Sequence, residues 1–134
     1  MFRQLTDIIF VSPQISIADV GQAQALGVTM IINNRPDDEE PGQVSGAQIE
    51  QAARDAGIGY AAVPGSHGGL ARWQLDGMSE ALDKAGGGKV LAYCRSGTRS
   101  TLLWALTRAR VGDDCDTLAQ TASAAGYDLA PVRQ

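Results

Sequence analysis

Short apolar runs alternate along this chain with longer segments that have a helical period. Four of these runs are short and apolar enough to be buried strands, and they lie at residues 8–11, 28–32, 58–63 and 89–93. Strands that alternate with helices need crossover connections, which are right-handed and build a parallel sheet. The alternation therefore predicts an α/β fold, with a mainly parallel sheet of four to five strands and helices on both faces.

Capping residues and glycines indicate where the helices begin and end. Ser16, with Asp19 three residues later, predicts the start of the first helix, and Gly27 predicts its end. An apolar stripe at helical spacing predicts a second helix that ends at Gly57. Further helices are expected over residues 75–85, 102–109 and 117–125. Because the connections are short, residues 1–134 are expected to form one domain.

The composition limits the classes of partner. A net charge of −4 provides no basic surface, so nucleic acid is not an expected partner. The chain has no apolar run long enough to cross a bilayer and no leader-like start, so we expect no membrane partner and a cytoplasmic location. Two cysteines and one histidine, without a Cys-x-x-Cys motif, do not suggest a zinc site, and no cofactor is expected.

The strongest chemical signal follows the strand expected at residues 89–93. The sequence there is Cys94-Arg95-Ser96-Gly97-Thr98-Arg99-Ser100, and a helix is expected to start within it. A tight loop before a helix points backbone N–H groups inward, and the helix terminus adds partial positive charge, which would favour a thiolate at Cys94. Gly97 permits a positive φ, and Arg99 could present a planar fork to two oxygens of an oxyanion. The loop therefore predicts a cysteine nucleophile in an anion-binding cradle.

Neighbouring side chains extend this predicted site. Further anion-binding residues of the loop are expected to be Arg95, Ser96, Thr98 and Ser100. Ser100 could also donate to the sulfur when the sulfur acts as a leaving group. Because loops at the carboxyl ends of parallel strands share one edge, the loops at residues 33–42, 64–70 and 94–100 are expected to meet. Arg35 is thus a candidate anion ligand, although it could equally pair with Glu39 or Glu40.

Hydrolysis of a phosphate ester also needs a group that protonates the leaving alcohol. His67, the sole histidine, lies in the rim loop at residues 64–70 and is the candidate general acid, against the alternative of a solvent-exposed loop histidine. Asp37 and Asp38 are weaker candidates, because a solvated acidic turn explains them better.

The segment Tyr93 to Ser100 resembles the active loop of the bacterial beta-lactamase-hydrolase-like family, phosphatase-like domain. Residues 11–15, 31–37 and 56–64 resemble other signatures of this family in the same order. The resemblance implies a three-layer fold similar to protein tyrosine and dual-specificity phosphatases. It implies that Cys94 is the cysteinyl-phosphate nucleophile and that Arg99 binds phosphate. The expected activity is hydrolysis of phosphate monoesters, with a phosphorylated small molecule or a phosphoprotein as substrate.

Two other functions remain open. Tyrosine phosphatases have a histidine before the cysteine and five residues between cysteine and arginine. In this chain Tyr93 precedes the cysteine, and four residues separate Cys94 from Arg99. The spacing Cys-Arg-x-Gly-x-Arg is similar to a rhodanese loop, whose cysteine carries a persulfide, so a sulfurtransferase that uses a sulfur donor is one alternative. A non-catalytic oxyanion-binding module is the other.

Overall fold

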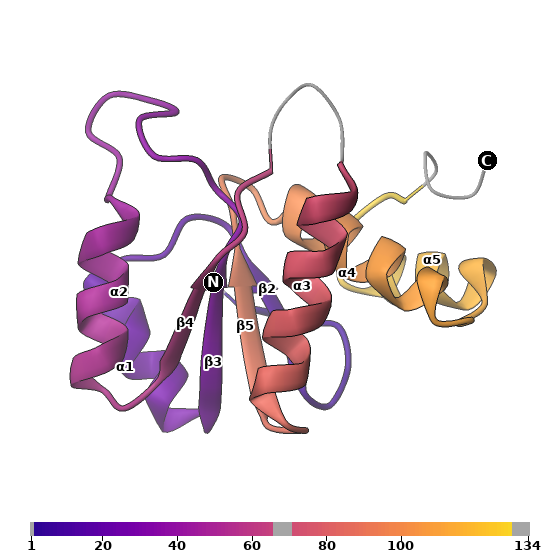
Figure 1. Cartoon of the computed structure of the whole chain (residues 1–134), viewed down its shortest axis with the longest axis horizontal. Helices are drawn as coiled ribbons and strands as arrows, with labels where there is room; N and C mark the ends of the chain where they lie inside the picture. The colour runs from indigo at the N-terminus through magenta and orange to yellow at the C-terminus, as the bar shows by residue number, and fades with distance from the viewer. Residues whose placement is uncertain (1, 66–70, 130–134) are drawn as a thin grey trace.

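Within residues 2–65 and 71–129, which the computed structural model describes, five strands form one sheet (Figure 1). The strands are β1 (Arg3–Gln4), β2 (Ile9–Ser12), β3 (Val28–Asn33), β4 (Gly59–Ala62) and β5 (Lys89–Tyr93). Their order across the sheet is β1-β2-β5-β3-β4. The pairs β2–β5, β5–β3 and β3–β4 are parallel, and β1 lies antiparallel to β2 at one edge. The prediction of a mainly parallel sheet of four to five strands is therefore confirmed.

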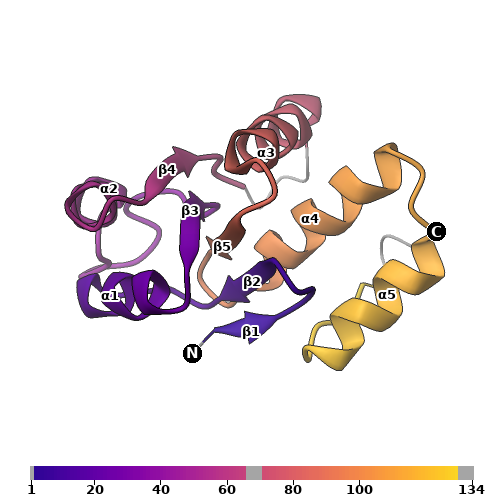
Figure 2. The same ribbon diagram turned by 90° about the horizontal axis from the view of Figure 1, so that it is seen from below.

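Helices cover both faces of this sheet (Figure 2). They are α1 (Ile17–Ala25), α2 (Gly46–Asp55), α3 (Arg72–Ala85), α4 (Thr98–Arg110) and α5 (Cys115–Ala124). Seen from below, α1 and α2 lie on one side of the strands, α3 and α4 lie on the other, and α5 packs outside α4. This arrangement confirms the predicted three-layer α/β fold.

Local signals explain the helix ends. Ser16 Oγ accepts a hydrogen bond from the Asp19 N–H group, and the Asp19 carboxylate accepts one from the Ser16 N–H group, which is the capping box that the spacing predicted. A second capping box, which the sequence reading did not identify, starts α2. Gly27 and Gly57 end α1 and α2 at positive φ values of 87° and 75°.

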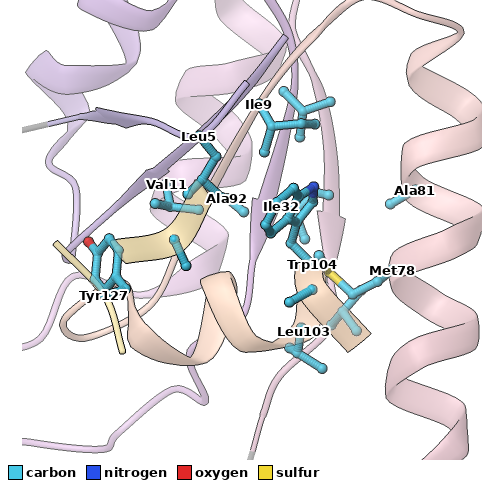
Figure 3. Packing of buried hydrophobic residues seen from close by; sticks show 14 of the residues in the cluster. Leu5, Ile9, Val11, Ile32, Met78, Ala81, Ala92, Leu103, Trp104 and Tyr127 are labelled. Carbon is cyan, nitrogen blue, oxygen red and sulfur yellow. The ribbon is translucent and has the colours of Figure 1, made fainter. Parts of the chain in front are cut away.

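Two apolar clusters hold the three layers together. Alternate residues of the central strands point to opposite faces, so Ile31 and Leu91 pack toward α1 and α2, whereas Ile32 and Ala92 pack toward α3 and α4. Figure 3 shows the cluster on the α3 and α4 side of the sheet, which also contains residues of α5 and of the segment after it. Burial of a large aliphatic side chain such as Ile32 contributes about 1.5–3 kcal/mol.

The register of the sheet places three strand ends side by side. Ser12 and Asn33 both pair with Tyr93, the last residue of β5. Gly65 joins the same edge through a hydrogen bond of 2.9 Å from its N–H group to the Asn34 carbonyl. The loops at residues 33–42 and 94–97 therefore meet with Gly65 at one rim, as predicted, while residues 66–70 lie outside the described part of the chain.

The short strand β1 was not predicted, because its two residues are exposed and carry no apolar pattern. None of the helices in the described ranges is long and apolar enough to span a membrane.

Candidate active site

Cys94 lies directly after β5 and is fully buried. Its Sγ atom accepts a hydrogen bond of 3.1 Å from the backbone N–H group of Gly97. Gly97 is the N-terminal cap of α4, so the sulfur sits where the helix presents unpaired N–H groups and partial positive charge. One backbone N–H group therefore contacts the Cys94 sulfur, and the anion-binding role of the whole loop stays a prediction.

Gly97 is required at this position for two reasons. Its φ of 95° lies in the region that residues with a Cβ atom rarely adopt. A Cβ atom there would also lie 2.8 Å from Cζ of Tyr127, which is closer than van der Waals contact. Glycine thus allows both the tight turn and the close approach of the Tyr127 ring.

The hydroxyl groups of the loop mostly stabilise the loop itself. Ser96 Oγ lies 3.0 Å from Thr98 Oγ1 and accepts a hydrogen bond of 3.3 Å from the Thr98 N–H group. Ser100 is buried, and its Oγ atom has no hydrogen-bond partner among the described residues. The bond from Ser100 to the sulfur was expected for the step in which the sulfur is the leaving group, and it stays a prediction.

Arg99, in the first turn of α4, is held by two other loops. Its Nη1 atom donates to the Gly65 carbonyl over 3.0 Å, and its Nη2 atom donates to Oε1 of Glu39 over 2.7 Å. The same Glu39 oxygen accepts from Nε of Arg35 over 2.9 Å. The Glu39 side chain is 8% exposed, and its carboxylate bonds two guanidinium groups at the rim.

Arg35 is engaged by protein side chains. Its Nη2 atom donates to Glu40 over 2.9 Å, and its Nη1 atom donates to Gln14 over 3.0 Å. The more exposed Arg95 lies 3.5 Å from the other oxygen of Glu40. Of the two alternatives for Arg35, pairing with Glu39 and Glu40 is the one observed, and its role as an anion ligand stays a prediction.

These contacts fix the ionisation of both glutamates. The hydrogen bond from Arg99, with that from Arg35, holds the pKa of Glu39 below its usual value, although burial opposes the shift. The hydrogen bond from Arg35 and the charge of Arg95 lower the pKa of Glu40. Burial acts to lower the pKa of Arg35, but its bonds to the two glutamates outweigh burial and raise it. Both carboxyl groups are therefore ionised near neutral pH and cannot supply a proton to a leaving group.

On the described part of the chain, no hydrogen bond or ion pair joins a predicted acid candidate to the Cys94 loop. Asp37 accepts a hydrogen bond of 2.8 Å from the Gly46 N–H group and so binds the start of α2. Asp38 is exposed, with a positive φ of 59°. His67 lies outside the described residues and stays a prediction.

The sequence reading missed two residues of this site. It considered Glu39 only as one possible partner of Arg35, and it did not pair Glu39 with Arg99, because these two residues are 60 positions apart. It also missed Tyr127, whose Oη atom donates to the Ser96 carbonyl over 3.2 Å, since no motif surrounds Tyr127.

Comparison with known sequences connects this site to a family. Residues 1–111 match the family model for the beta-lactamase hydrolase-like protein, phosphatase-like domain. The chain is 34% identical over 109 residues to the beta-lactamase hydrolase-like protein of Agrobacterium fabrum. That alignment covers 81% of this chain and 25% of the relative, so the chain spans about a quarter of the length of the curated relative it matches.

Solved structures share the fold. A candidate phosphatase from Neisseria meningitidis is 37% identical, with a TM-score of 0.85 over 98% of this chain and 92% of that chain. The structure of P. aeruginosa TpbA in complex with pTyr is 19% identical, with a TM-score of 0.65 over 90% of this chain and 70% of that chain, and shows likeness of fold alone. The chain therefore belongs to the family of the beta-lactamase hydrolase-like protein, phosphatase-like domain, and has the α/β fold of protein tyrosine phosphatase-like proteins.

Proposed function

We propose that this chain is a cysteine-dependent phosphatase that hydrolyses phosphate monoesters through a phosphorylated Cys94. The observation that carries the proposal is the position of the Cys94 sulfur, 3.1 Å from the Gly97 N–H group at the start of α4, with Arg99 in the first turn of the same helix. A nucleophile and a planar cation thus share one anion-binding helix terminus. Membership of a phosphatase-like family supports the same chemistry.

The reaction proceeds in two steps that conserve atoms and charge. In the first, the Cys94 thiolate attacks phosphorus, a phosphorus–sulfur bond forms, and the bond to the ester oxygen breaks. The leaving oxygen takes a proton, while Arg99 and the N–H groups of the loop bind the other phosphoryl oxygens. In the second step, water attacks phosphorus, a phosphorus–oxygen bond forms, and the phosphorus–sulfur bond breaks. Dihydrogen phosphate leaves with both protons of the water, and the thiolate is restored.

The charges around the site favour an anionic substrate. Three guanidinium groups, those of Arg35, Arg95 and Arg99, are bound to two carboxylates, those of Glu39 and Glu40. This group of five side chains carries one net positive charge, and the start of α4 adds more. A phosphorylated small molecule or a phosphoprotein fits this field.

For the proton of the leaving group we propose His67. It follows Gly65, whose carbonyl accepts from Arg99, by two residues, and two residues span at most about 7 Å of chain. If His67 is the acid, His67→Gln should slow the hydrolysis of alkyl phosphates more than that of p-nitrophenyl phosphate, because p-nitrophenolate is a much weaker base than an alkoxide and depends less on protonation. Equal slowing of both substrates contradicts this assignment.

Hydrolysis of p-nitrophenyl phosphate tests the proposal. We expect the wild type to turn over under reducing conditions, Cys94→Ser to lose activity by at least about a thousandfold, and Cys115→Ser to keep it. Cys115 is a matched control because it is the second cysteine, is exposed, and lies at the start of α5. A folded wild type without turnover, or a fully active Cys94→Ser variant, contradicts the proposal.

A sulfurtransferase is the second candidate, favoured by the four-residue interval between Cys94 and Arg99. In that reaction the thiolate attacks the outer sulfur of thiosulfate, the sulfur–sulfur bond breaks, and sulfite leaves without needing a proton. A wild type that does not hydrolyse p-nitrophenyl phosphate but gains one sulfur atom at Cys94 from thiosulfate establishes this alternative.

A further inference from the structure

Tyr127 contacts the Cys94 loop from a part of the chain beyond residues 1–111, which the family model matches. It follows α5, is 8% exposed, and lies at the margin of the apolar cluster in Figure 3. Its ring fills the space where Gly97 lacks a side chain. Its Oη atom donates a hydrogen bond of 3.2 Å to the Ser96 carbonyl.

The N-terminal strand holds Tyr127 in this position. The guanidinium carbon of Arg3 lies 5.6 Å from the centre of the Tyr127 ring, within the range of a cation–π contact. Arg3 Nη1 also donates to the Ala125 carbonyl over 2.9 Å, and the Tyr127 N–H group donates to the Ala122 carbonyl over 2.9 Å. The ring is thereby fixed from the side of β1 and from the end of α5.

One peptide group joins Tyr127 to the nucleophile. The Ser96 carbonyl, which accepts from Tyr127, and the Gly97 N–H group, which donates to the Cys94 sulfur, belong to the same peptide unit. A peptide unit is planar and rigid, so fixing the direction of its carbonyl also fixes the direction of its N–H group. Hydrogen bonds in such a chain also strengthen one another.

We propose that Tyr127 is a positioning residue that holds the Gly97 N–H group on the Cys94 sulfur through the Ser96–Gly97 peptide. This proposal rests on the proposed function only in assuming that the Cys94 sulfur is the nucleophile. The contacts of Tyr127 and Gly97 around the sulfur do not depend on that assumption. Tyr127 does not touch the reacting atoms. Its effect is to orient the donor that stabilises the thiolate, and Arg3 supports the ring that does so.

The test measures the thiolate directly. In a Cys115→Ser background, the ultraviolet absorbance of the thiolate is followed against pH for the parent and for Tyr127→Phe. We expect the midpoint of thiolate formation to move upward by about half a unit to one unit, because the donor to the sulfur is no longer oriented. The acid limb of the kcat/KM profile for p-nitrophenyl phosphate should move by the same amount, with kcat/KM below the midpoint reduced about threefold to tenfold.

Thr107→Val is the matched control. Thr107 is buried in α4, and its hydroxyl donates to the Leu103 carbonyl over 2.7 Å, so this variant also loses one hydroxyl-to-carbonyl hydrogen bond. It lies away from the loop and should leave the thiolate midpoint unchanged. Arg3→Met, at an exposed position, should move the midpoint upward by less than Tyr127→Phe and serves if Tyr127→Phe fails to fold.

A midpoint that stays at the parental value in folded Tyr127→Phe, or in Arg3→Met if Tyr127→Phe does not fold, overturns the proposal. The same holds if Thr107→Val moves the midpoint as far as Tyr127→Phe does, because the effect would then be one of general stability. Thiolate titration does not require turnover. A shifted midpoint in a protein without phosphatase activity would therefore support the role of Tyr127 while refuting the proposed function.

Discussion

Glu39, at the rim of the site, both orients the Arg99 side chain and neutralises part of its charge. One of its carboxylate oxygens accepts from both Arg35 and Arg99, at 2.9 and 2.7 Å. The carboxylate therefore fixes the direction of the Arg99 fork but also neutralises part of its charge. These two effects act in opposite directions on substrate binding and on catalysis.

Glu39→Gln separates the two effects. Removal of the negative charge should tighten the binding of inorganic phosphate about threefold to tenfold, while kcat falls by a similar factor because Arg99 loses its fixed orientation. Calorimetry with phosphate and steady-state kinetics measure the two quantities. Asp113→Asn, which breaks a surface pair with Arg108 at 2.8 Å, is the control and should change neither. Weaker phosphate binding in Glu39→Gln contradicts this interpretation.

Glu39 also makes stability depend on pH. The hydrogen bond from Arg99 lowers its pKa in the folded chain below that in the unfolded chain. A carboxyl group of this kind stabilises the fold above the unfolded pKa of about 4.3, and the contribution is lost as pH falls through the folded pKa. Urea unfolding should therefore show that wild type exceeds Glu39→Gln in stability at about pH 7, and that the difference shrinks by about pH 3. A difference that does not change with pH contradicts the assignment.

The residues that could be predicted from the sequence are those whose chemistry is local. Cys94, Gly97 and Arg99 lie within one short loop between a strand and a helix, so their approximate arrangement follows from spacing. The contacts of Glu39 with Arg99 and of Tyr127 with Ser96 could not be predicted, because they join positions 60 and 31 residues apart. Such contacts depend on how the sheet edge brings loops together.

Among the elements, the loop before α4 is the one whose conformation matters most for function. Gly97 and Gly112 have similar φ values of 95° and 102°, but only Gly97 has a neighbour where a Cβ atom would lie. Comparison of the two glycines therefore separates the cost of the backbone conformation from the cost of contact with Tyr127.

Gly112→Ala should lower the free energy of unfolding by about 1 kcal/mol, since only the backbone is strained. Gly97→Ala should cost about 2–4 kcal/mol and should also abolish phosphate binding, because Tyr127 and the loop must move apart. Denaturant unfolding and calorimetry measure these quantities. Equal costs for the two variants would mean that Tyr127 does not pack against Gly97 as described.

Element boundaries were predictable wherever a backbone signal accompanied the apolar pattern. Gly27, Gly57 and the capping box of α1 fixed helix ends, and β5 begins and ends at the predicted residues. The strand β1 carried no such signal, since it pairs through its backbone at the sheet edge. Its contribution lies in Arg3, which reaches Tyr127.

At the scale of the whole molecule, one apolar cluster includes residues from within and beyond the part that the family model matches. Large side chains after residue 111 belong to the cluster that also contains Leu5, Val11 and Trp104, and these are Leu118, Tyr127 and Leu129. Burial of each contributes about 1.5–3 kcal/mol, and a domain has a total stability of about 5–15 kcal/mol. We therefore expect the segment from α5 to Leu129 to be needed for a stable fold.

A chain shortened to residues 1–111 tests this conclusion. We expect it to lose cooperative thermal unfolding and to show red-shifted tryptophan fluorescence, because Trp104 loses neighbours that now cover it. The full chain carrying Leu118→Ala is the milder comparison and should remain folded, with stability lowered by about 2–4 kcal/mol. A cooperative and active chain of residues 1–111 contradicts the conclusion.

The measurement that most directly tests the proposed chemistry is mass spectrometry of the Cys94 peptide after rapid acid quenching of a reaction with p-nitrophenyl phosphate. We expect one phosphoryl group on Cys94 during turnover, none on Cys115, and none at either position in Cys94→Ser. Turnover without phosphorylated Cys94, or a phosphoryl group on another residue, would contradict a Cys94 phospho-intermediate.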